Sequence, residues 1–442
     1  MRPGARAAAA IEILIDLERR RRPAAEAVKD WMLTHRFAGA RDRAAIGDLV
    51  FGALRWKASS AYRMQAETPR AWVLGALRWG FGQAPEAIER GCYEPHAPSP
   101  PSEAERAALL EETPASRLEG APPWVVGDYP EWLEPEFVRA FGEQRAEEGA
   151  ALALPAPLDL RANRLLSERE RLREALGQSR ALDGPPALTP LAPDGLRIPW
   201  RAGRSFAWAV EPSFLDGWFE VQDEGSQLAA LLSDARPGMQ VADVCAGGGG
   251  KTLALAAAME NRGQIYAFDV EGRRLAPLKA RADRAGVRNL QIRFPVQQGG
   301  ELKDLAGRMD LVLVDAPCTG SGTWRRNPDA KWRVRPGALQ QRQGEQQQAL
   351  DLAAALVRPG GRLAYVTCSV LPSENEAAVA AFLTRHEGFL RGSPEESVCA
   401  AAPPELAEKV LRASRLLGSG LQLTPARSGC DGFFLAMLRR KS

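Results

Sequence analysis

Short apolar segments alternate with helical segments through the second half of this chain, and this order constrains the fold more than any other feature. The strand-like runs are residues 241–244, 264–268, 290–294, 310–314 and 362–366. The helical patterns between and after them are residues 252–259, 271–285 and 337–357. Such alternation is typical of a parallel sheet with helices on both faces. We therefore predict an α/β, doubly wound, Rossmann-like domain over residues 221–442, with an antiparallel edge strand at 433–438.

The first half of the chain has a different pattern. Helical apolar spacing through residues 5–88 predicts a small all-α domain over residues 1–93. Residues 94–129 are rich in Pro, Glu and Ala without strand or long-helix periodicity, and we interpret them as a linker. Residues 130–220 combine a helix, a short strand and a Pro-rich span, which predicts a small α+β domain.

Composition excludes several classes of protein. The 442 residues carry a net charge of only +3, so the basic runs, such as Arg19 to Arg22, do not by themselves indicate nucleic-acid binding. The six cysteines lack metal-ligand spacing and there are three histidines, which argues against a disulfide framework and against a metal site. The chain shows no signal peptide and no apolar stretch that could span a bilayer. We expect a soluble, cytoplasmic protein with free thiols.

Two cysteines each follow one of the predicted strands. Cys318 comes after the run 310–314 in an Asp-Ala-Pro-Cys sequence, and Cys368 comes after the run 362–366 between Thr367 and Ser369. Ligands of open α/β sheets bind outside the carboxyl ends of the strands. Both thiols are therefore predicted to face one pocket. The alternative is a buried structural cysteine, but polar neighbours on both sides of Cys368 favour a functional one.

A glycine-rich loop joins the first predicted strand to the next helix, and the N–H groups at such a helix start bind anionic or polar ligands. A phosphate-binding P-loop would need Gly in place of Cys245, and a dinucleotide fingerprint would need Gly in place of Thr252. We predict an S-adenosylmethionine site instead, with Asp269 binding the ribose hydroxyls. A tight turn and a capping Asp are the simpler alternative. The predicted loop residues are Cys245, Ala246, Gly247, Gly248, Gly249, Gly250 and Lys251.

These parts suit methylation of a pyrimidine at carbon 5. That carbon becomes nucleophilic after a thiolate adds to C6, and proton loss with elimination then restores the ring. Cys318, Cys368 and Asp315 supply two thiols and a hydrogen-bonding group for the N3 edge of a cytosine. A helix beginning with Ser373 as N-cap and Glu376 as its capping-box partner would help to lower a thiol pKa.

Cationic and aromatic residues alternate in the segment from Trp324 to Trp332, which suits an RNA strand with splayed bases. An ordinary charged surface loop is the alternative. The residues predicted to contact RNA are Arg161, Asn163, Arg164, Arg325, Arg326 and Lys331.

At the level of whole motifs, the chain resembles the RNA cytosine-C5 methyltransferases, and among them the bacterial Fmu/Sun type that acts on small-subunit ribosomal RNA. The resemblance spans nearly the whole chain. It rests on residues 222–226, 245–252, 315–318, 325–332, 367–375, 423–425 and 431–434.

The resemblance implies a role for each site residue. Cys368 is the covalent nucleophile, Cys318 assists elimination and product release, and Asp315 contacts the cytosine and the cofactor side. Residues 245–251 and Asp269 hold S-adenosylmethionine. The N-terminal helices resemble a NusB-like RNA-binding domain, and a monomer that binds RNA without metal or membrane is expected.

One stretch departs from the family pattern. The family usually carries an Asp after the third strand that contacts the adenine, but residues 295–300 contain no carboxylate, which leaves Gln297 or Gln298 as a substitute. Two other functions stay open at this stage. They are a non-catalytic RNA-binding or ribosome assembly factor, and a nucleotide hydrolase that uses residues 250–252.

Overall fold

The computed structural model describes residues 1–110, 118–202, 206–296 and 300–442. The chain divides into two compact units, each assembled from separate stretches of sequence. Unit 1 consists of Met1–Pro155, Trp200–Ser205 and Trp324–Val334. Unit 2 consists of Ala156–Pro199, Phe206–Thr323 and Arg335–Ser442.

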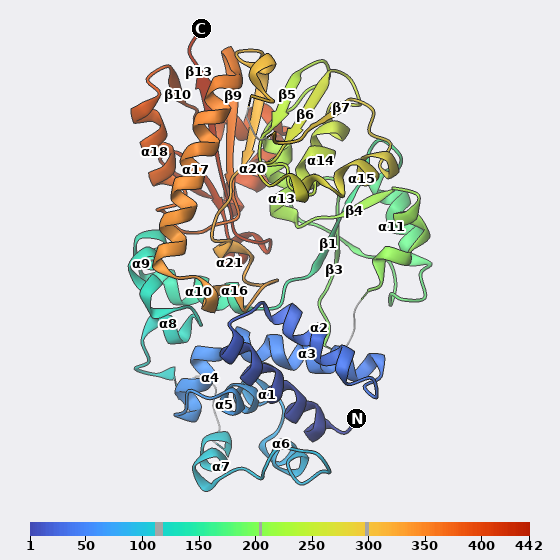
Figure 1. Ribbon diagram of the computed structural model, residues 1–442, viewed down its shortest axis with the longest axis vertical. Coiled ribbons are helices and arrows are strands. Elements are labelled where there is room, and N and C mark those ends of the chain that lie inside the picture. Colours follow the sequence, from blue (N-terminus) through green and yellow to red (C-terminus); the bar gives the residue numbers. More distant parts are fainter. Residues whose placement is uncertain (111–117, 203–205, 297–299) are drawn as a thin grey trace. The chain divides into compact units, whose positions relative to one another are not determined.

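Unit 1 is built from helices (Figure 1). They are α1 (Pro3–Arg20), α2 (Ala24–Thr34), α3 (Ala40–Arg55), α4 (Lys57–Met64), α5 (Pro69–Gly75), α6 (Pro85–Gly91), α7 (Glu103–Leu110), α8 (Pro123–Val126), α9 (Glu134–Phe141), α10 (Arg145–Ala153) and α16 (Ala330–Arg333). Helical spacing places Ile13, Leu14 and Leu17 of α1 on one face, where they meet Val50 and Leu54 of α3 in a shared apolar core. Burial of each such side chain contributes about 1.5–3 kcal/mol.

The division of the chain differs from the one that the sequence predicts. The span 94–129, expected to be a linker, contains α7 and α8, and the helices up to Pro155 belong to unit 1 rather than to the small α+β part. The segment Trp324–Val334 also belongs to unit 1, where Trp324 stacks on Phe137 with ring centroids 6.0 Å apart. Contacts between residues so distant in sequence leave no local signal.

Unit 2 contains the predicted doubly wound sheet, which confirms the α/β fold class. Its strands run in the order β11-β12-β13-β9-β8-β5-β6-β7, with β10 pairing β13. The parallel strands are β5 (Gln240–Asp243), β6 (Gln264–Phe268), β7 (Leu290–Arg293), β8 (Met309–Asp315) and β9 (Val357–Thr367). The antiparallel strands are β10 (Phe389–Arg391), β11 (Arg415–Leu417), β12 (Gly420–Leu423) and β13 (Phe433–Arg440). The strand order reverses between β5 and β8, which is where such sheets bind ligands.

Helices cover both faces of this sheet, which explains the continuous apolar runs of its central strands. Leu311 and Leu313 of β8 face one core, and Val312 and Val314 face the other. The first core is closed by α13 (Glu224–Leu232), α14 (Gly250–Ala258), α19 (Pro394–Ala401) and α20 (Pro404–Ala413). The second is closed by α17 (Pro336–Leu356) and α18 (Glu376–Arg385), which lie along the sheet in Figure 1.

Three local predictions in unit 2 are wrong. The tail strand β13 is not at the sheet edge, because it pairs with β9 on one side and β12 on the other. The helix predicted at 271–285 is split at Pro277 into a 3-10 turn (Gly272–Leu275) and α15 (Leu278–Arg284), since proline cannot donate the helical hydrogen bond. Ser373 is not the N-cap of α18, which begins at Glu376 after a turn.

A small antiparallel sheet, in the order β2-β3-β1-β4, precedes the large one. Its strands are β1 (Leu158–Ala162), β2 (Ala187–Leu188), β3 (Gly195–Ile198) and β4 (Phe219–Val221), and its flanking helices are α11 (Arg169–Gly177) and α12 (Pro212–Leu215).

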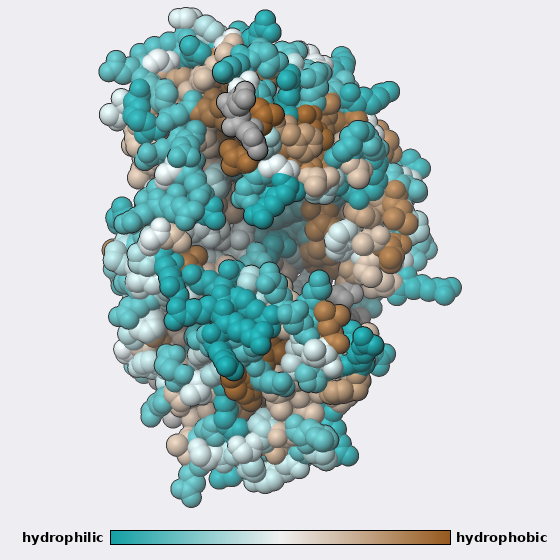
Figure 2. Space-filling model, in the orientation of Figure 1, coloured by the Kyte–Doolittle hydropathy of each residue, from teal (hydrophilic) through white to brown (hydrophobic). Residues whose placement is uncertain are grey.

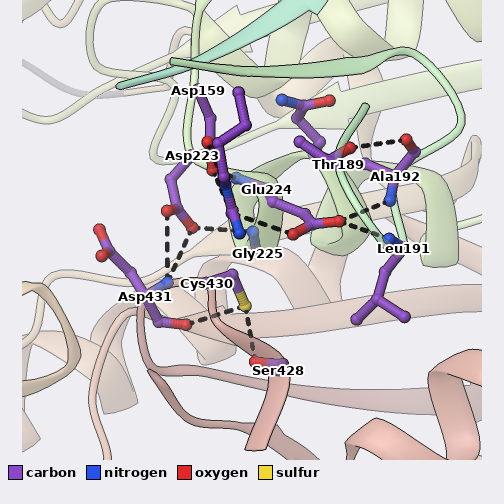
Figure 3. Close-up of polar contacts among 12 residues, drawn as sticks. Asp159, Thr189, Leu191, Ala192, Asp223, Glu224, Gly225, Ser428, Cys430 and Asp431 are labelled. Carbon is purple, nitrogen blue, oxygen red and sulfur yellow. Dashed lines mark hydrogen bonds and ion pairs between the residues drawn. The ribbon is translucent and has the colours of Figure 1, made fainter. Parts of the chain in front are cut away.

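Partly buried polar contacts connect this small sheet to the rest of unit 2 (Figure 3). Arg197 pairs with Asp159 at 2.7 Å and with Glu224 at 3.1 Å. The carboxylate of Asp223 accepts the backbone N–H of Asp431 at 3.2 Å. The Gln-Asp-Glu-Gly-Ser motif is therefore a structural junction.

The visible face in Figure 2 is mostly hydrophilic, with hydrophobic residues in separate smaller patches. Within the described ranges, none of the helices has the length and apolar character needed to cross a bilayer.

Candidate active site

The two predicted thiols meet in unit 2. Strands β8 and β9 are parallel neighbours, with Asp315 opposite Val366, so the loops that follow them leave the sheet side by side. Cys318 Sγ and Cys368 Sγ are 3.4 Å apart, and both side chains are half-buried. The contact with Cys368, together with burial, raises the pKa of the Cys318 thiol well above its ordinary value. Cys318 therefore keeps its proton near neutral pH.

Asp315 ends β8 and connects the thiols to the glycine loop. Its Oδ2 accepts a hydrogen bond from Lys251 Nζ at 2.8 Å. Burial would lower the pKa of Lys251, but the charge and the hydrogen bond of Asp315 raise it above its ordinary value. The lysine that a P-loop hydrolase would direct at a phosphate is thus paired with Asp315, which removes the support for that alternative.

The glycine loop has the backbone of a tight ligand cradle. Gly247 and Gly249 have φ angles of +51° and +85°, and a Cβ on Gly249 would lie 2.1 Å from Leu278 Cδ1. Cys245 is half-buried, and burial raises the pKa of its thiol well above the ordinary value. This loop requires glycine for its conformation and for the close approach of α15.

Asp269 anchors the same loop. Its Oδ2 accepts the N–H of Gly247 at 2.9 Å, and its Oδ1 accepts the N–H of Glu271 at 2.9 Å. Arg274 lies 3.3 Å from the carboxylate. Each Asp269 oxygen keeps a lone pair that can accept a hydrogen bond from a ribose hydroxyl. Gln297 and Gln298, the candidates for the adenine contact, lie outside the described residues.

Asp243 at the end of β5 was not predicted as a site residue. Its Oδ2 accepts the Thr252 hydroxyl at 2.7 Å, but its buried Oδ1 has no hydrogen-bond partner among the described residues. Burial raises the pKa of Asp243 to about 7. An acceptor without a partner beside the cradle fits a ligand that carries positive charge, and S-adenosylmethionine carries a sulfonium and an ammonium group.

The structure separates the residues predicted to contact RNA. Arg164 is exposed, with 63% of its side chain accessible, and lies 3.9 Å from Asp194. Arg161 and Asn163 are buried, and their side chains donate to Gln222 Oε1 and to backbone carbonyls. Burial lowers the pKa of Arg161 to about 10. These two residues shape the small sheet rather than present a surface to RNA.

Within unit 1, Lys331 corrects another prediction. Its ammonium is buried and donates to the carbonyls of Arg55 at 2.7 Å and Asp128 at 2.5 Å. Burial lowers the pKa of Lys331 to about 7. Lys331 therefore anchors its segment inside unit 1. Arg325 is buried as well, whereas Arg326 is half-buried and lines a cleft of unit 1 together with Trp200.

Comparison with known proteins identifies the family. A family model described as 16S rRNA methyltransferase RsmB/F matches residues 230–439. The probable ribosomal RNA small subunit methyltransferase B of Synechocystis sp. is 34% identical over 316 residues, which are 71% of this chain and 67% of that protein. The chain belongs to the RsmB/F family.

Solved structures share the fold of this RsmB/F family chain. The crystal structure of PH0851 covers 100% of both chains with a TM-score of 0.71 at 24% identity. NSun6 from Pyrococcus horikoshii, solved with SFG, covers 72% of this chain and 100% of its own, with a TM-score of 0.58 at 21% identity. Family membership confirms the resemblance, the Rossmann-like methyltransferase domain and the prediction of an S-adenosylmethionine-dependent methyltransferase.

Proposed function

We propose that this RsmB/F family chain methylates carbon 5 of a cytosine in small-subunit (16S) ribosomal RNA, through a covalent bond between Cys368 and C6. The observation that carries the proposal is the 3.4 Å separation of two sulfurs at adjacent strand ends, next to the Lys251–Asp315 pair of the glycine loop. The cytosine must leave its base stack to reach these half-buried thiols.

In this mechanism Cys368 adds to C6, and the electron pair moves to C5. S-Adenosylmethionine supplies an electrophilic methyl group on its sulfonium when bound. Asp315, held by Lys251, provides the hydrogen-bonding group for the N3 edge of the cytosine. Once C5 carries the methyl group, a water molecule takes the C5 proton, and the electrons of the C5–H bond restore the C5–C6 double bond as the Cys368–C6 bond breaks. The Cys318 thiol supports this step, because an S–H donated to the Cys368 sulfur stabilises the departing thiolate.

The test combines labelled S-adenosylmethionine, total RNA and two cysteine variants. We expect wild-type protein to label small-subunit RNA, Cys368→Ala to abolish labelling, and Cys318→Ala to accumulate a protein–RNA adduct on a denaturing gel. Cys399→Ala is the matched control, because Cys399 is an exposed thiol that follows neither strand of the site. Methylation by Cys368→Ala, or no adduct with Cys318→Ala, would contradict the assigned roles.

A non-catalytic ribosome assembly factor would show RNA binding without any label in RNA. If RNA is labelled instead, bisulfite mapping of ribosomal RNA from a deletion strain identifies the modified nucleotide. The comparison strain carries the Cys368→Ala protein, which keeps the fold and the RNA contacts while the nucleophile is lost.

The remaining features of the proposal concern RNA binding and the cell. Unit 1 is proposed to act as a NusB-like RNA-binding part, with Arg326 and, from unit 2, Arg164 as contacts. The protein is proposed to act as a monomer, without metal, in the cytoplasm, where the free thiols stay reduced. Size exclusion with and without RNA tests the monomer.

A further inference from the structure

Glu374 has a side chain that the reaction scheme above leaves unused. The residue is completely buried and lies two positions before the start of α18. Its Oε1 accepts the backbone N–H of Thr319 at 2.8 Å, and its Oε2 accepts the Thr319 hydroxyl at 2.5 Å. Oε2 also accepts the Ser369 hydroxyl at 2.5 Å. All three bonds come from two loops that are far apart in sequence.

These partners are the residues that directly follow the two thiols. Thr319 follows Cys318, and Ser369 follows Cys368. A single carboxylate thus fixes the position after each cysteine. Gln346 of α17 reinforces the arrangement, because its Nε2 donates both to Glu374 Oε1 at 3.1 Å and to Pro317 O at 3.0 Å.

Further bonds make the two loops one rigid body around this carboxylate. The N–H of Gly322 donates to Cys368 O at 2.9 Å, and the Ser321 and Ser369 hydroxyls are 2.9 Å apart. The neighbouring Asn375 donates from Nδ2 to Ser369 O at 2.9 Å. Buried hydrogen-bond networks of this kind hold their side chains in a defined geometry.

We propose that Glu374 is a positioning residue that locks the Cys318 and Cys368 loops together and sets the distance between the two sulfurs. The proposal rests on the proposed function for its catalytic consequence. A capping box formed by Ser373 and Glu376 would have placed Glu374 in the first turn of the helix. The positioning role explains why the Glu374 side chain instead points into the protein, before the helix begins.

The charge of Glu374 has a second effect. Its carboxylate is among the groups that raise the pKa of the Cys318 thiol, after Cys368 and burial. Burial raises the pKa of Glu374 above its ordinary value, and the hydrogen bonds from Ser369 and Thr319 oppose this rise by favouring the carboxylate. The residue that positions both thiols therefore also helps to keep the proton on Cys318.

The first measurement needs no RNA. Wild-type protein, Glu374→Ala and Glu374→Gln are treated with a mild thiol oxidant, and mass spectrometry follows the rate of Cys318–Cys368 disulfide formation. We expect Glu374→Ala to slow this reaction, because without the carboxylate the two cysteine loops no longer hold the sulfurs in contact. Glu374→Gln should be intermediate, since its remaining oxygen still accepts from one loop and hydroxyls turn to accept from its amide.

The second measurement is methylation kinetics. Misplacement of reacting groups by about 1 Å costs on the order of 100-fold in rate, so kcat of Glu374→Ala should fall by about that factor. The affinity for S-adenosylmethionine should stay unchanged, because among the described residues the Glu374 carboxylate bonds only to Thr319, Ser369 and Gln346, which lie outside the glycine loop. Partial recovery of kcat in Glu374→Gln would separate positioning from general destabilisation.

Glu376→Gln is the matched control. This carboxylate lies two residues later, is half-exposed, and has no hydrogen bond to either cysteine loop in the part of the chain that the structure describes. Folded Glu374→Ala and Glu374→Gln proteins with wild-type disulfide rates would overturn the proposal. Inactive wild-type protein with a slowed disulfide rate in Glu374→Ala would instead overturn the proposed function and leave the positioning role standing.

Discussion

Asp243 predicts a pH dependence of cofactor binding. The carboxyl group is buried, and its pKa is about 7 because burial disfavours the charged form. A bound cation beside its Oδ1, which has no hydrogen-bond partner among the described residues, would favour the carboxylate. Cofactor binding should therefore release a proton from Asp243 below neutral pH, and affinity for S-adenosylmethionine should rise as pH rises.

The size of the effect follows from the fraction of Asp243 that is already ionised. With a pKa of about 7, this fraction is about one tenth at about pH 6 and about three quarters at about pH 7.5. If binding requires the carboxylate, affinity should increase about eightfold over that interval, which is about 1.2 kcal/mol. The α-amino group of the cofactor, with a pKa of about 7.7–8.0, loses less than half of its charge over this range, so its titration changes the affinity by less than about twofold and in the opposite direction.

Isothermal titration calorimetry across this range, in two buffers with different ionisation enthalpies, measures both the affinity and the proton release. Asp243→Asn keeps the size of the side chain and its acceptor for the Thr252 hydroxyl, and should bind with a nearly constant affinity. The cofactor-free protein has the opposite trend. Its folded form holds the Asp243 proton that the unfolded chain has lost, so stability should fall as pH rises from about 4 to about 7. A wild-type affinity that is flat with pH, or an equal slope in Asp243→Asn, would refute the reasoning.

Other perturbations test the remaining parts of the structure. Lys331→Met should destabilise unit 1 by about 2 kcal/mol. Two buried carbonyls would lose their hydrogen-bond donor, which costs about 1–3 kcal/mol for each, and removal of a buried charge would offset part of that cost. Hydrogen exchange in α3 would measure this, and unchanged protection would contradict the anchor role. Arg164→Ala should weaken RNA binding equally for all RNA sequences, because the exposed guanidinium would contact a phosphate. Filter binding at several salt concentrations should show that the slope of log affinity against log salt concentration falls in magnitude by about 1. An unchanged slope would show that Arg164 does not contact RNA. Gly249→Ala should abolish measurable cofactor binding, because the new Cβ would lie 2.1 Å from Leu278 Cδ1. Gly307→Ala is the control, because its φ is also positive, at +65°, but its Cβ would meet open space. Thermal unfolding of Gly307→Ala should show only a strain cost of about 1–2 kcal/mol.

Local sequence patterns determined most of the catalytic domain. The parallel strands of the doubly wound sheet were predicted within about five residues, because a strand covered on both faces is a continuous apolar run. The short antiparallel strands β10, β11 and β12 were not predicted. The meeting of Cys318 and Cys368 was predictable for a related reason, since parallel neighbours end at the same edge of a sheet. The motifs around these residues were enough to place the chain in its family.

Tertiary structure decided which charged residues are accessible and which hold the fold together. Lys331 belongs to a basic, aromatic segment that suits RNA in sequence, yet its ammonium is buried against carbonyls of residues more than 200 positions away. Glu374 lies in a sequence that suggests a helix cap, yet its carboxylate joins two cysteine loops. Hydrogen bonds between distant segments depend on which parts of the chain the tertiary fold brings together. A short stretch of neighbouring residues does not contain that information.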